Sequence, residues 1–471
     1  MPVAAEQELL ETPVVRPGHY GTRVGAVEPG GAEFIPIEER HGRARQLFWT
    51  WTSPNLEFAT VFVGVLVVAG FGLDFPRAVL AIVVGTLAGS ACHGVLSAEG
   101  PAAGVPQMML GRISFGHWGN ILPAGLNAVT AGIGWFAVNS VSGAFAVHTL
   151  THFSTLSCLL VVVAVQLAVA FFGHNLVHVF ERVVFPLLAL GFVLAAVWIL
   201  GDGHVGGGGH SVPGAFWLSV GATFGYAAGW NPYASDYTRY LPARTSRWAT
   251  GLWAGAGVGL SCVALEVLGA VSATSSGPSE LTDPTGSFTR VLPPAVRDLT
   301  LLAIALGAVS ANVLNIYSGA LSAAAAGVRL PVRTRRAVVG LGLGAVGLVV
   351  AITALHDAGQ RYESFLLVIA YWIGPWLGVA LTDLVLRRGR TPGGVLFDPR
   401  YRQPAGPLAM LVAMGVSIPL FSNQTEFVGL VPRHHPGVGD LTFEVGFVLA
   451  AALYAGLHRL GRRRAAVAGG G

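Results

Sequence analysis

Apolar stretches of about 20 residues recur along almost the whole of this chain, and an α-helix of that length crosses the hydrocarbon core of a bilayer. Of its 471 residues, 53% are hydrophobic and only 11% are charged, against roughly 25% charged residues in soluble domains. A soluble enzyme with an oversized core would need charged faces between its elements, and the sequence lacks them. The pattern therefore predicts an all-α polytopic membrane protein.

The apolar stretches divide into twelve predicted transmembrane helices. They cover residues 55–73, 78–98, 118–148, 155–173, 180–201, 214–240, 248–272, 298–327, 336–355, 361–386, 405–422 and 442–460. The chain contains no lysine, and with the N-terminus inside, 23 of its 28 arginines fall on inner segments. Only five fall outside: Arg77, Arg290, Arg297, Arg361 and Arg433. Because positive residues concentrate on the cytoplasmic side, both termini of this plasma-membrane protein are expected in the cytoplasm.

The predicted helices divide the chain into four parts. Residues 1–50 are polar and contain Pro and Gly, and we expect a disordered cytoplasmic tail there. Residues 51–205 and 206–390 hold five predicted helices each, and residues 391–471 hold two peripheral helices and a short cytoplasmic C-terminus. The three cysteines lie inside apolar runs without the spacing of a metal site or a disulfide framework.

The sixth predicted helix contains the residues GYAAGWNP (225–232) in the middle of an apolar run. Pro232 removes a backbone donor, and Gly225 and Gly229 loosen the turn, so this helix is expected to break into two halves. Such a break persists in a membrane only where it lines a cavity. Gly64 marks a milder interruption of the first helix, although packing explains it equally well. Breaks at matching positions of two five-helix halves predict an inverted-repeat transporter with its site at the midplane.

Polar and aromatic side chains lie near the centres of two further predicted helices. Trp135 and Asn139 share one face of the third helix, and Asn312 and Asn315 share one face of the eighth. Taken alone, each amide is as readily explained by hydrogen bonds between helices, and Trp135 by packing. Taken together, a stacking face and amides that donate and accept along one edge fit a flat, neutral heterocycle. They fit an α-amino acid poorly, because its charges need charged partners.

One ionisable residue, Glu266, falls at the centre of the seventh predicted helix. Ionisable residues inside a membrane are commonly functional, so Glu266 is a candidate proton carrier. A protonated, hydrogen-bonded structural role explains it equally well, and the sequence leaves both explanations open.

Four segments resemble the cytosine/purine permease branch of the nucleobase:cation symporter-1 family. They read SAEGPAAGVPQMMLGRISFG (97–116), GWFAVNS (134–140), GHNLVHVFERVVFP (173–186) and GWNPYASDYTRYLP (229–242). The resemblance implies a leucine-transporter-like fold with ten helices in two inverted repeats and two peripheral helices. It also implies inward transport of a nucleobase together with Na⁺ or H⁺.

The resemblance implies roles for individual residues. Trp135 matches the family's stacking tryptophan, Asn139 matches its polar neighbour one turn later, and Asn315 matches the amide that bonds the substrate. The sequence departs from the family at the second stacking aromatic, on the sixth helix.

The position of that second aromatic falls on Ala227. Tyr226 or Trp230 would have to replace it, and the sequence does not choose between them. Gly64 and Gly229, at the two predicted interruptions, are expected to line the same site.

For the coupled ion, the resemblance implies a sodium site between the first and eighth helices. Backbone carbonyls near Val63 to Leu66 would face hydroxyls of the eighth helix. Sodium-dependent relatives carry two adjacent hydroxyls there, but here Val309 precedes Ser310. We therefore expect proton coupling or weak sodium dependence, with no metal beyond a sodium ion at Ser310 and no cofactor beyond the coupled H⁺ or Na⁺.

The sequence thus predicts a secondary active importer of cytosine or a related purine or pyrimidine, working by alternating access. The nearest alternative is an importer of another planar heterocycle, such as a hydantoin, allantoin or a vitamin-like compound. A membrane enzyme would need a nucleophile–base pair or a metal cluster at midspan, and neither is evident; nor is the signalling domain that a sensor would carry. We expect a monomer in the lipid bilayer without a nucleic-acid partner, because the net charge of +4 reflects topology.

Overall fold

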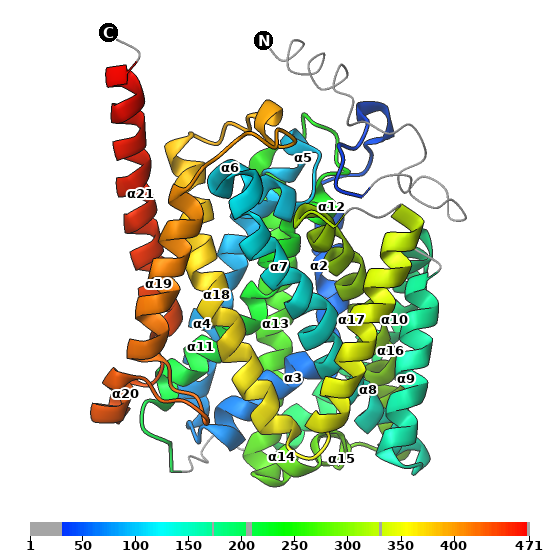
Figure 1. Ribbon diagram of the computed structural model, residues 1–471. Helices are drawn as coiled ribbons and strands as arrows, with labels where there is room; N and C mark the ends of the chain where they lie inside the picture. Colours follow the sequence, from blue (N-terminus) through cyan, green and yellow to red (C-terminus); the bar gives the residue numbers. More distant parts are fainter. Residues whose placement is uncertain (1–30, 172–173, 204–209, 329–331, 469–471) are drawn as a thin grey trace.

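The computed structural model describes residues 31–171, 174–203, 210–328 and 332–468. In these ranges the chain is a bundle of helices, and the only β-type pairing is one isolated bridge between Asn423 and Val428. The helices are α2 (Gln46–Thr52), α3 (Phe58–Val65), α4 (Phe75–Ser97), α5 (Gly100–Ala103), α6 (Gln107–Gly119), α7 (Ile121–Val129), α8 (Phe136–Thr151), α9 (Thr155–Phe171), α10 (His174–Asp202), α11 (Ala215–Ala228), α12 (Ala234–Thr238), α13 (Arg247–Ser276), α14 (Ser279–Thr282), α15 (Pro284–Thr289), α16 (Pro294–Ala325), α17 (Val332–Ala354), α18 (Ala358–Leu386), α19 (Ala405–Phe421), α20 (Leu430–His434) and α21 (Thr442–Ala468). α5 and the end of α21 lie at one end of the bundle, and α14 and α15 lie at the other (Figure 1).

The helices agree with the predicted membrane class. Within the described residues, seven are long and apolar enough to cross a membrane, and an eighth is added if α2 and α3 form one bent span. Three shorter apolar helices coincide with the predicted fourth, ninth and eleventh spans: Thr155–Ala168, Gly340–Ala354 and Ala405–Phe421. The all-α membrane fold is confirmed, whereas the number of twelve crossings stays a prediction.

The first broken helix starts and breaks earlier than the sequence predicts. α2 and a 3₁₀ turn at Ser53–Asn55 meet α3 at an angle of 66°. The cause is local, because Pro54 opens the turn and the extended residue Glu57 caps α3 by accepting a hydrogen bond from the Ala59 amide. The predicted milder interruption at Gly64 is displaced by two residues, since Gly64 lies inside α3 and the α-helix changes to a π-helix at Leu66–Gly70.

Gly64 instead allows α3 to approach α13. A Cβ atom on Gly64 would lie 1.7 Å from the carbonyl oxygen of Glu266, and one on Gly269 would lie 1.9 Å from that of Val61. The two helices therefore cross backbone to backbone, as small residues permit inside membranes. The contacts support the packing explanation of Gly64 and place it outside the candidate site.

The sixth helix is interrupted where the sequence predicts. α11 ends at Ala228, a 3₁₀ turn spans Asn231–Tyr233, and α12 continues from Ala234. Pro232 lies at the start of the turn, where its missing donor breaks no helical hydrogen bond. The break is therefore an ordered part of the buried interior.

Part of the predicted tail packs against the protein. Ile35 is 1% exposed, and the Arg40 side chain donates hydrogen bonds to the carbonyls of Ile35 (3.0 Å) and Pro101 (2.7 Å). α2, most of which the sequence assigned to the tail, is the first half of the broken helix. The prediction of a disordered tail is thus wrong for residues 31–50, and residues 1–30 lie outside the described residues.

The last two long helices lie at one edge of the bundle, α19 and α21 side by side next to α18 (Figure 1). Gly378 of α18 lets α21 approach, since a Cβ atom there would lie 2.4 Å from the carbonyl oxygen of Phe447. Their position agrees with the peripheral role expected from the sequence. The assignment of the preceding helices to two repeats stays a prediction.

Candidate functional site

Asn55, at the break of the first helix, connects three elements. Its Nδ2 donates to Ser261 Oγ on α13 at 2.9 Å, and its Oδ1 accepts a hydrogen bond from Trp230 Nε1 at 2.8 Å. Trp230 belongs to the break of the sixth helix. The two interruptions therefore lie side by side in the interior of the bundle.

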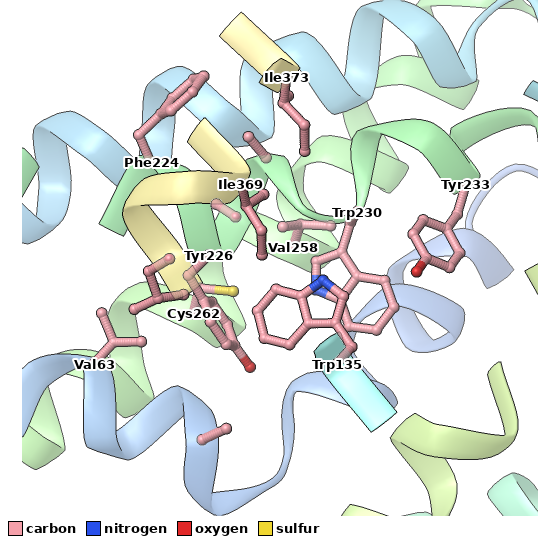
Figure 2. Close-up of a cluster of buried hydrophobic side chains, with 14 of the residues drawn as sticks. Val63, Trp135, Phe224, Tyr226, Trp230, Tyr233, Val258, Cys262, Ile369 and Ile373 are labelled. Carbon is pink, nitrogen blue, oxygen red and sulfur yellow. The ribbon is translucent and has the colours of Figure 1, made fainter. Parts of the chain in front are cut away.

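An aromatic corner forms next to these breaks. The rings of Trp135 and Tyr226 are 5.5 Å apart at 84°, and Trp230 belongs to the same buried cluster (Figure 2). Gly229 completes the corner, because a Cβ atom there would lie 2.8 Å from the Trp135 ring. A planar ligand stacked on one of the two perpendicular rings would meet the other edge-on.

Ala227 does not take part in this corner. Its methyl group faces α4, where a Cβ atom on Gly89 would lie 2.9 Å from it. The expectation that Ala227 lines the site is corrected by this packing. Of the two possible replacements for the missing aromatic, Tyr226 contacts Trp135, whereas Trp230 is held by Asn55.

Three amides meet between α8 and α16. Asn139 and Asn315 both donate to Asn312 Oδ1, at 3.1 and 3.3 Å. The Asn312 amide donates in turn to Gln166 and to the Phe136 carbonyl, both at 3.0 Å. Asn312 therefore fills the role of interhelical hydrogen bonding that the sequence left open.

Asn139 and Asn315 differ from Asn312 in their surroundings. Tyr233 of the broken helix donates to Asn315 Oδ1 at 3.2 Å, which brings the amides to the helix break. Asn139 Oδ1 is buried and has no hydrogen-bond partner within the described residues. A buried acceptor without a partner calls for an explanation, and a ligand with a hydrogen-bond donor supplies one.

Glu57 is the residue that the sequence analysis missed. It is 2% exposed, and its Oε1 accepts a hydrogen bond from the Tyr226 hydroxyl at 3.3 Å. The Thr60 hydroxyl contacts that of Tyr226 and lies 2.7 Å from the Asn55 carbonyl oxygen, to which it can donate. The signal was present as a carboxylate inside an apolar run, but the run was taken to begin only two residues earlier.

A cavity of about 170 Å³ lies beside the corner, towards the end of the bundle that holds α15. Phe365 of α18 is a wall of this cavity and packs against Trp135 with ring centroids 5.1 Å apart. The same ring covers Gly134, where a Cβ atom would lie 2.1 Å from it. Phe365 is therefore the partition between the cavity and the aromatic corner.

A sequence model of one protein family, described as a permease for cytosine/purines, uracil, thiamine, allantoin, matches residues 34–397. The chain belongs to this permease family. The matched range includes both broken helices, the aromatic corner and the amides. Membership confirms the resemblance seen in the sequence and the expectation of a transporter rather than an enzyme.

Named relatives of this permease cover nearly its full length. The putative purine-cytosine permease YxlA of Bacillus subtilis is 28% identical over 444 residues, which are 91% of this chain and 95% of the relative. The purine-cytosine permease fcyB of Emericella nidulans is 30% identical over 454 residues, with 91% and 87% covered.

Solved structures share the fold of this permease. Mhp1, a nucleobase-cation-symport-1 family transporter, in a closed conformation with bromovinylhydantoin bound, matches with a TM-score of 0.69 and 21% identity, covering 92% of this chain and 95% of Mhp1. Its inward-facing conformation gives a TM-score of 0.70 and 19% identity, with 94% and 95% covered. These matches confirm the predicted leucine-transporter-like fold.

Glu266 of this permease forms no hydrogen bond to the amides or the aromatic corner within the described residues. It is fully buried on α13, and its Oε2 accepts a hydrogen bond from Thr86 Oγ1 of α4 at 2.5 Å. Its Oε1 has no partner within the described residues. One oxygen of the carboxyl is thus hydrogen-bonded and the other is not. Both a structural and a proton-carrying role stay open.

The sodium site expected at Val63 and Leu66 is corrected by the position of the break. Val63 lies in α3 and Leu66 begins a π-helix (Leu66–Gly70), and the Val63 carbonyl accepts a hydrogen bond from the Leu66 amide. At the break, the carbonyl oxygen of Leu56 instead lies close to α16. A Cβ atom on Gly307 of α16 would lie 2.5 Å from this oxygen. Ser310, one turn further along α16, is 1% exposed, and its hydroxyl has no partner within the described chain. No cluster of three or more metal-binding side chains occurs among the described residues.

Proposed function

We propose that this chain imports cytosine or a related purine or pyrimidine together with a cation, by alternating access around its two broken helices. The proposal includes a plasma-membrane location, both termini in the cytoplasm and a monomeric transport unit without a nucleic-acid partner. The observation that carries it is the meeting of Trp135, Tyr226 and the amides Asn139 and Asn315 at the junction of the breaks.

The chemistry of this junction supports a base with an amino group. Base–aromatic stacking contributes about 1–3 kcal/mol, and Trp135 offers the face for it. Carboxylates accept hydrogen bonds from the exocyclic amine of cytosine, and amides pair with the edge of adenine. Glu57 and Asn139 Oδ1 are acceptors of these two kinds, and Glu57 reaches the corner through Tyr226.

An importer of another planar heterocycle is the second candidate. The family description names thiamine and allantoin beside the nucleobases, and the Mhp1 structure holds a hydantoin. Both compound classes would stack on Trp135. A carboxylate and an unpaired amide oxygen near the corner favour bases with an exocyclic amine, because the amine donates two hydrogen bonds from one edge.

Uptake of radiolabelled compounds, measured in cells that lack their own permeases, tests the proposal. Cytosine, adenine, guanine and hypoxanthine are compared with uracil, hydantoin, allantoin and thiamine, each also as an unlabelled competitor. Saturable uptake of an amino-substituted base, inhibited by other bases, supports the assignment. Uptake of hydantoin, allantoin or thiamine without competition by any nucleobase would replace it with the second candidate.

Cation coupling follows from energetics. A neutral base gains nothing from the membrane potential, so its accumulation needs a cotransported ion. Glu57 and Glu266 are the proposed proton carriers, since both are buried carboxyls in the membrane interior. Ser310 is the proposed side-chain ligand of a weakly bound Na⁺ ion.

Alternating access requires a barrier on each side of the site. Phe365 is the proposed outer barrier, because it stands between Trp135 and the cavity next to α15. Rotation of its ring away from Gly134 would open the aromatic corner to that cavity. Replacing Phe365 by Ala is expected to let a water-soluble thiol reagent reach a cysteine that replaces Asn139 from outside.

A further inference from the structure

A groove on the outer surface of the bundle, away from the candidate site, runs between α4 and α13 and ends at the C-terminus of α18. Its volume is about 900 Å³. The floor is formed by Gly94, Gly251 and Gly255, and side chains such as Leu252 and Leu260 form its walls.

The glycines explain why the groove exists. A Cβ atom on Gly94 would lie 2.6 Å from the Gly251 carbonyl oxygen, and one on Gly251 would lie 2.8 Å from that of Gly94. The two helices therefore touch through their backbones, and no side chain rises from the line of contact. Leu252 and Leu260 flank this line and are 67% and 61% exposed. In a bilayer, the groove is therefore apolar and open to lipid chains.

One end of the groove is strongly basic. Arg247 and Arg388 line it there, beside Arg387, which is already engaged by Glu99 at 2.6 Å and Asp383 at 2.9 Å. Arg247 donates one hydrogen bond to the Gly389 carbonyl at 3.0 Å, lies 3.7 Å from Glu99 and is half exposed. The Arg388 side chain is exposed and has no hydrogen bond or ion pair to any residue that the structure describes.

Two further features of this end favour an anion at a membrane surface. α13 begins at Arg247, so the positive end of the dipole of a 30-residue helix points at the basic mouth. The next residue, Trp248, is 90% exposed, and tryptophan concentrates at the level of lipid headgroups. Apolar walls, a basic mouth and an interfacial tryptophan follow one another along a single groove.

We propose that this groove binds an anionic phospholipid, whose phosphate contacts Arg388 and Arg247 and whose acyl chain lies along Gly94, Gly251 and Gly255. Guanidinium groups form charge-assisted, often bidentate hydrogen bonds with phosphate. Basic pockets between membrane helices on the cytoplasmic side bind anionic headgroups, and the arginine distribution puts this mouth on that side. The ligand has to be amphipathic. The basic end of the groove binds only a charged group, and the apolar walls bind only a hydrocarbon chain.

The test is lipid retention by the full-length protein. Protein equilibrated in nanodiscs of equal phosphatidylglycerol and phosphatidylcholine is extracted into detergent, and the retained lipids are quantified by mass spectrometry. Wild type is expected to retain phosphatidylglycerol in preference to phosphatidylcholine. Arg388→Gln is expected to lower that retention about tenfold, the loss typical of one charge-assisted hydrogen bond. Ala91→Trp, which fills the groove from the exposed face of α4, should lower it as well.

Arg400→Gln is the matched control, because Arg400 is an exposed arginine of the same end of the bundle that does not line the groove. It should leave lipid retention and uptake unchanged. A thermal shift on adding lysophosphatidylglycerol but not glycerol phosphate would show that the acyl chain is required.

Three outcomes would overturn the proposal. Equal retention of both lipids by wild type would remove the headgroup preference. If Arg388→Gln and Ala91→Trp both retain as much phosphatidylglycerol as wild type, the lipid binds at another site. A two-copy mass that Ala91→Trp reduces to one copy would assign the groove to contact with a second copy of this chain.

Discussion

The Tyr226 hydroxyl donates a hydrogen bond to Glu57 Oε1 across 3.3 Å, and this contact joins the two broken helices next to Trp135. Any movement of one break relative to the other has to stretch or exchange it. Tyr226 also forms the aromatic corner. A change in the protonation of Glu57 and a change in the position of a stacked ligand would therefore both act on the Tyr226 side chain. The contact therefore links the proposed stacking site to a buried carboxyl group.

Replacing Glu57 by Gln tests that route. The substitution keeps the size and the acceptor for Tyr226 but removes titration. We expect accumulation against a gradient to be lost, while exchange of pre-loaded base persists. The measurement is paired net uptake and counterflow in proteoliposomes. Glu363→Gln is the control, because Glu363 lines a separate pocket beside Leu281 and Gly359. Normal accumulation by Glu57→Gln would remove Glu57 from coupling.

Trp135→Ala should remove the stacking face. A loss of ~1–3 kcal/mol corresponds to a rise in apparent KM of about 5- to 150-fold, with normal amounts of protein in the membrane. Trp135→Phe should restore part of the affinity. Trp198→Ala, at a half-exposed tryptophan of α10, controls for the loss of an indole, and an unchanged KM for Trp135→Ala would contradict stacking.

The amides should separate into two kinds. Asn139→Ala and Asn315→Ala each remove one hydrogen bond to the base, worth about 0.5–1.5 kcal/mol, and should change the order of preferred bases in competition assays. Asn312→Ala should instead lower thermal stability, because Asn312 holds Gln166 and the Phe136 carbonyl. An unchanged order of preference in all three variants would return every amide to a structural role.

The sequence predicted those elements whose signals are local. Pro232 between Gly229 and Tyr233 marked the break of the sixth helix, and the 3.6-residue spacing placed Trp135 and Asn139 on one face. The break of the first helix was misplaced because the apolar pattern runs on through Gly64, whereas the interruption rests on Pro54 and on Glu57 capping α3.

Long-range contacts could not be predicted in this way. That Ala227 faces α4 and Tyr226 faces Trp135 depends on how α11 is rotated, and its hydrophobic pattern carries no such preference because all its sides are buried. The packing of segment 31–50 could not be predicted for the same reason, since Ile35 and Arg40 contact residues that lie more than 60 positions away in the chain.

Glu266→Gln distinguishes the second carboxyl from the first. Glu266 is bonded to Thr86 and, within the described residues, to no side chain of the aromatic corner, so its replacement should leave substrate affinity unchanged. If it carries the proton, accumulation should fail and exchange should persist; Thr86→Val should then shift the pH dependence of uptake. Wild-type accumulation by Glu266→Gln would establish the structural role.

The coupled ion is the last prediction, and it rests on the number of oxygen atoms near the first break. A hard cation prefers about six or more oxygen ligands. The break supplies carbonyls such as that of Leu56, and the buried hydroxyls of Ser53 and Ser310 have no partner within the described residues. Val309 offers only methyl groups at the position where sodium-dependent relatives place a hydroxyl. We therefore expect proton coupling, or at most a weak sodium dependence.

Uptake at fixed pH with sodium replaced by choline should fall by less than about twofold, below the effect of one hydrogen bond. Collapse of the proton gradient with an ionophore should abolish accumulation. A steep sodium requirement that survives the ionophore would show the prediction wrong. In that case Ser310→Ala and Ser53→Ala should each raise the sodium concentration for half-maximal uptake, whereas Ser417→Ala, at a buried serine of α19 far from the break, should not.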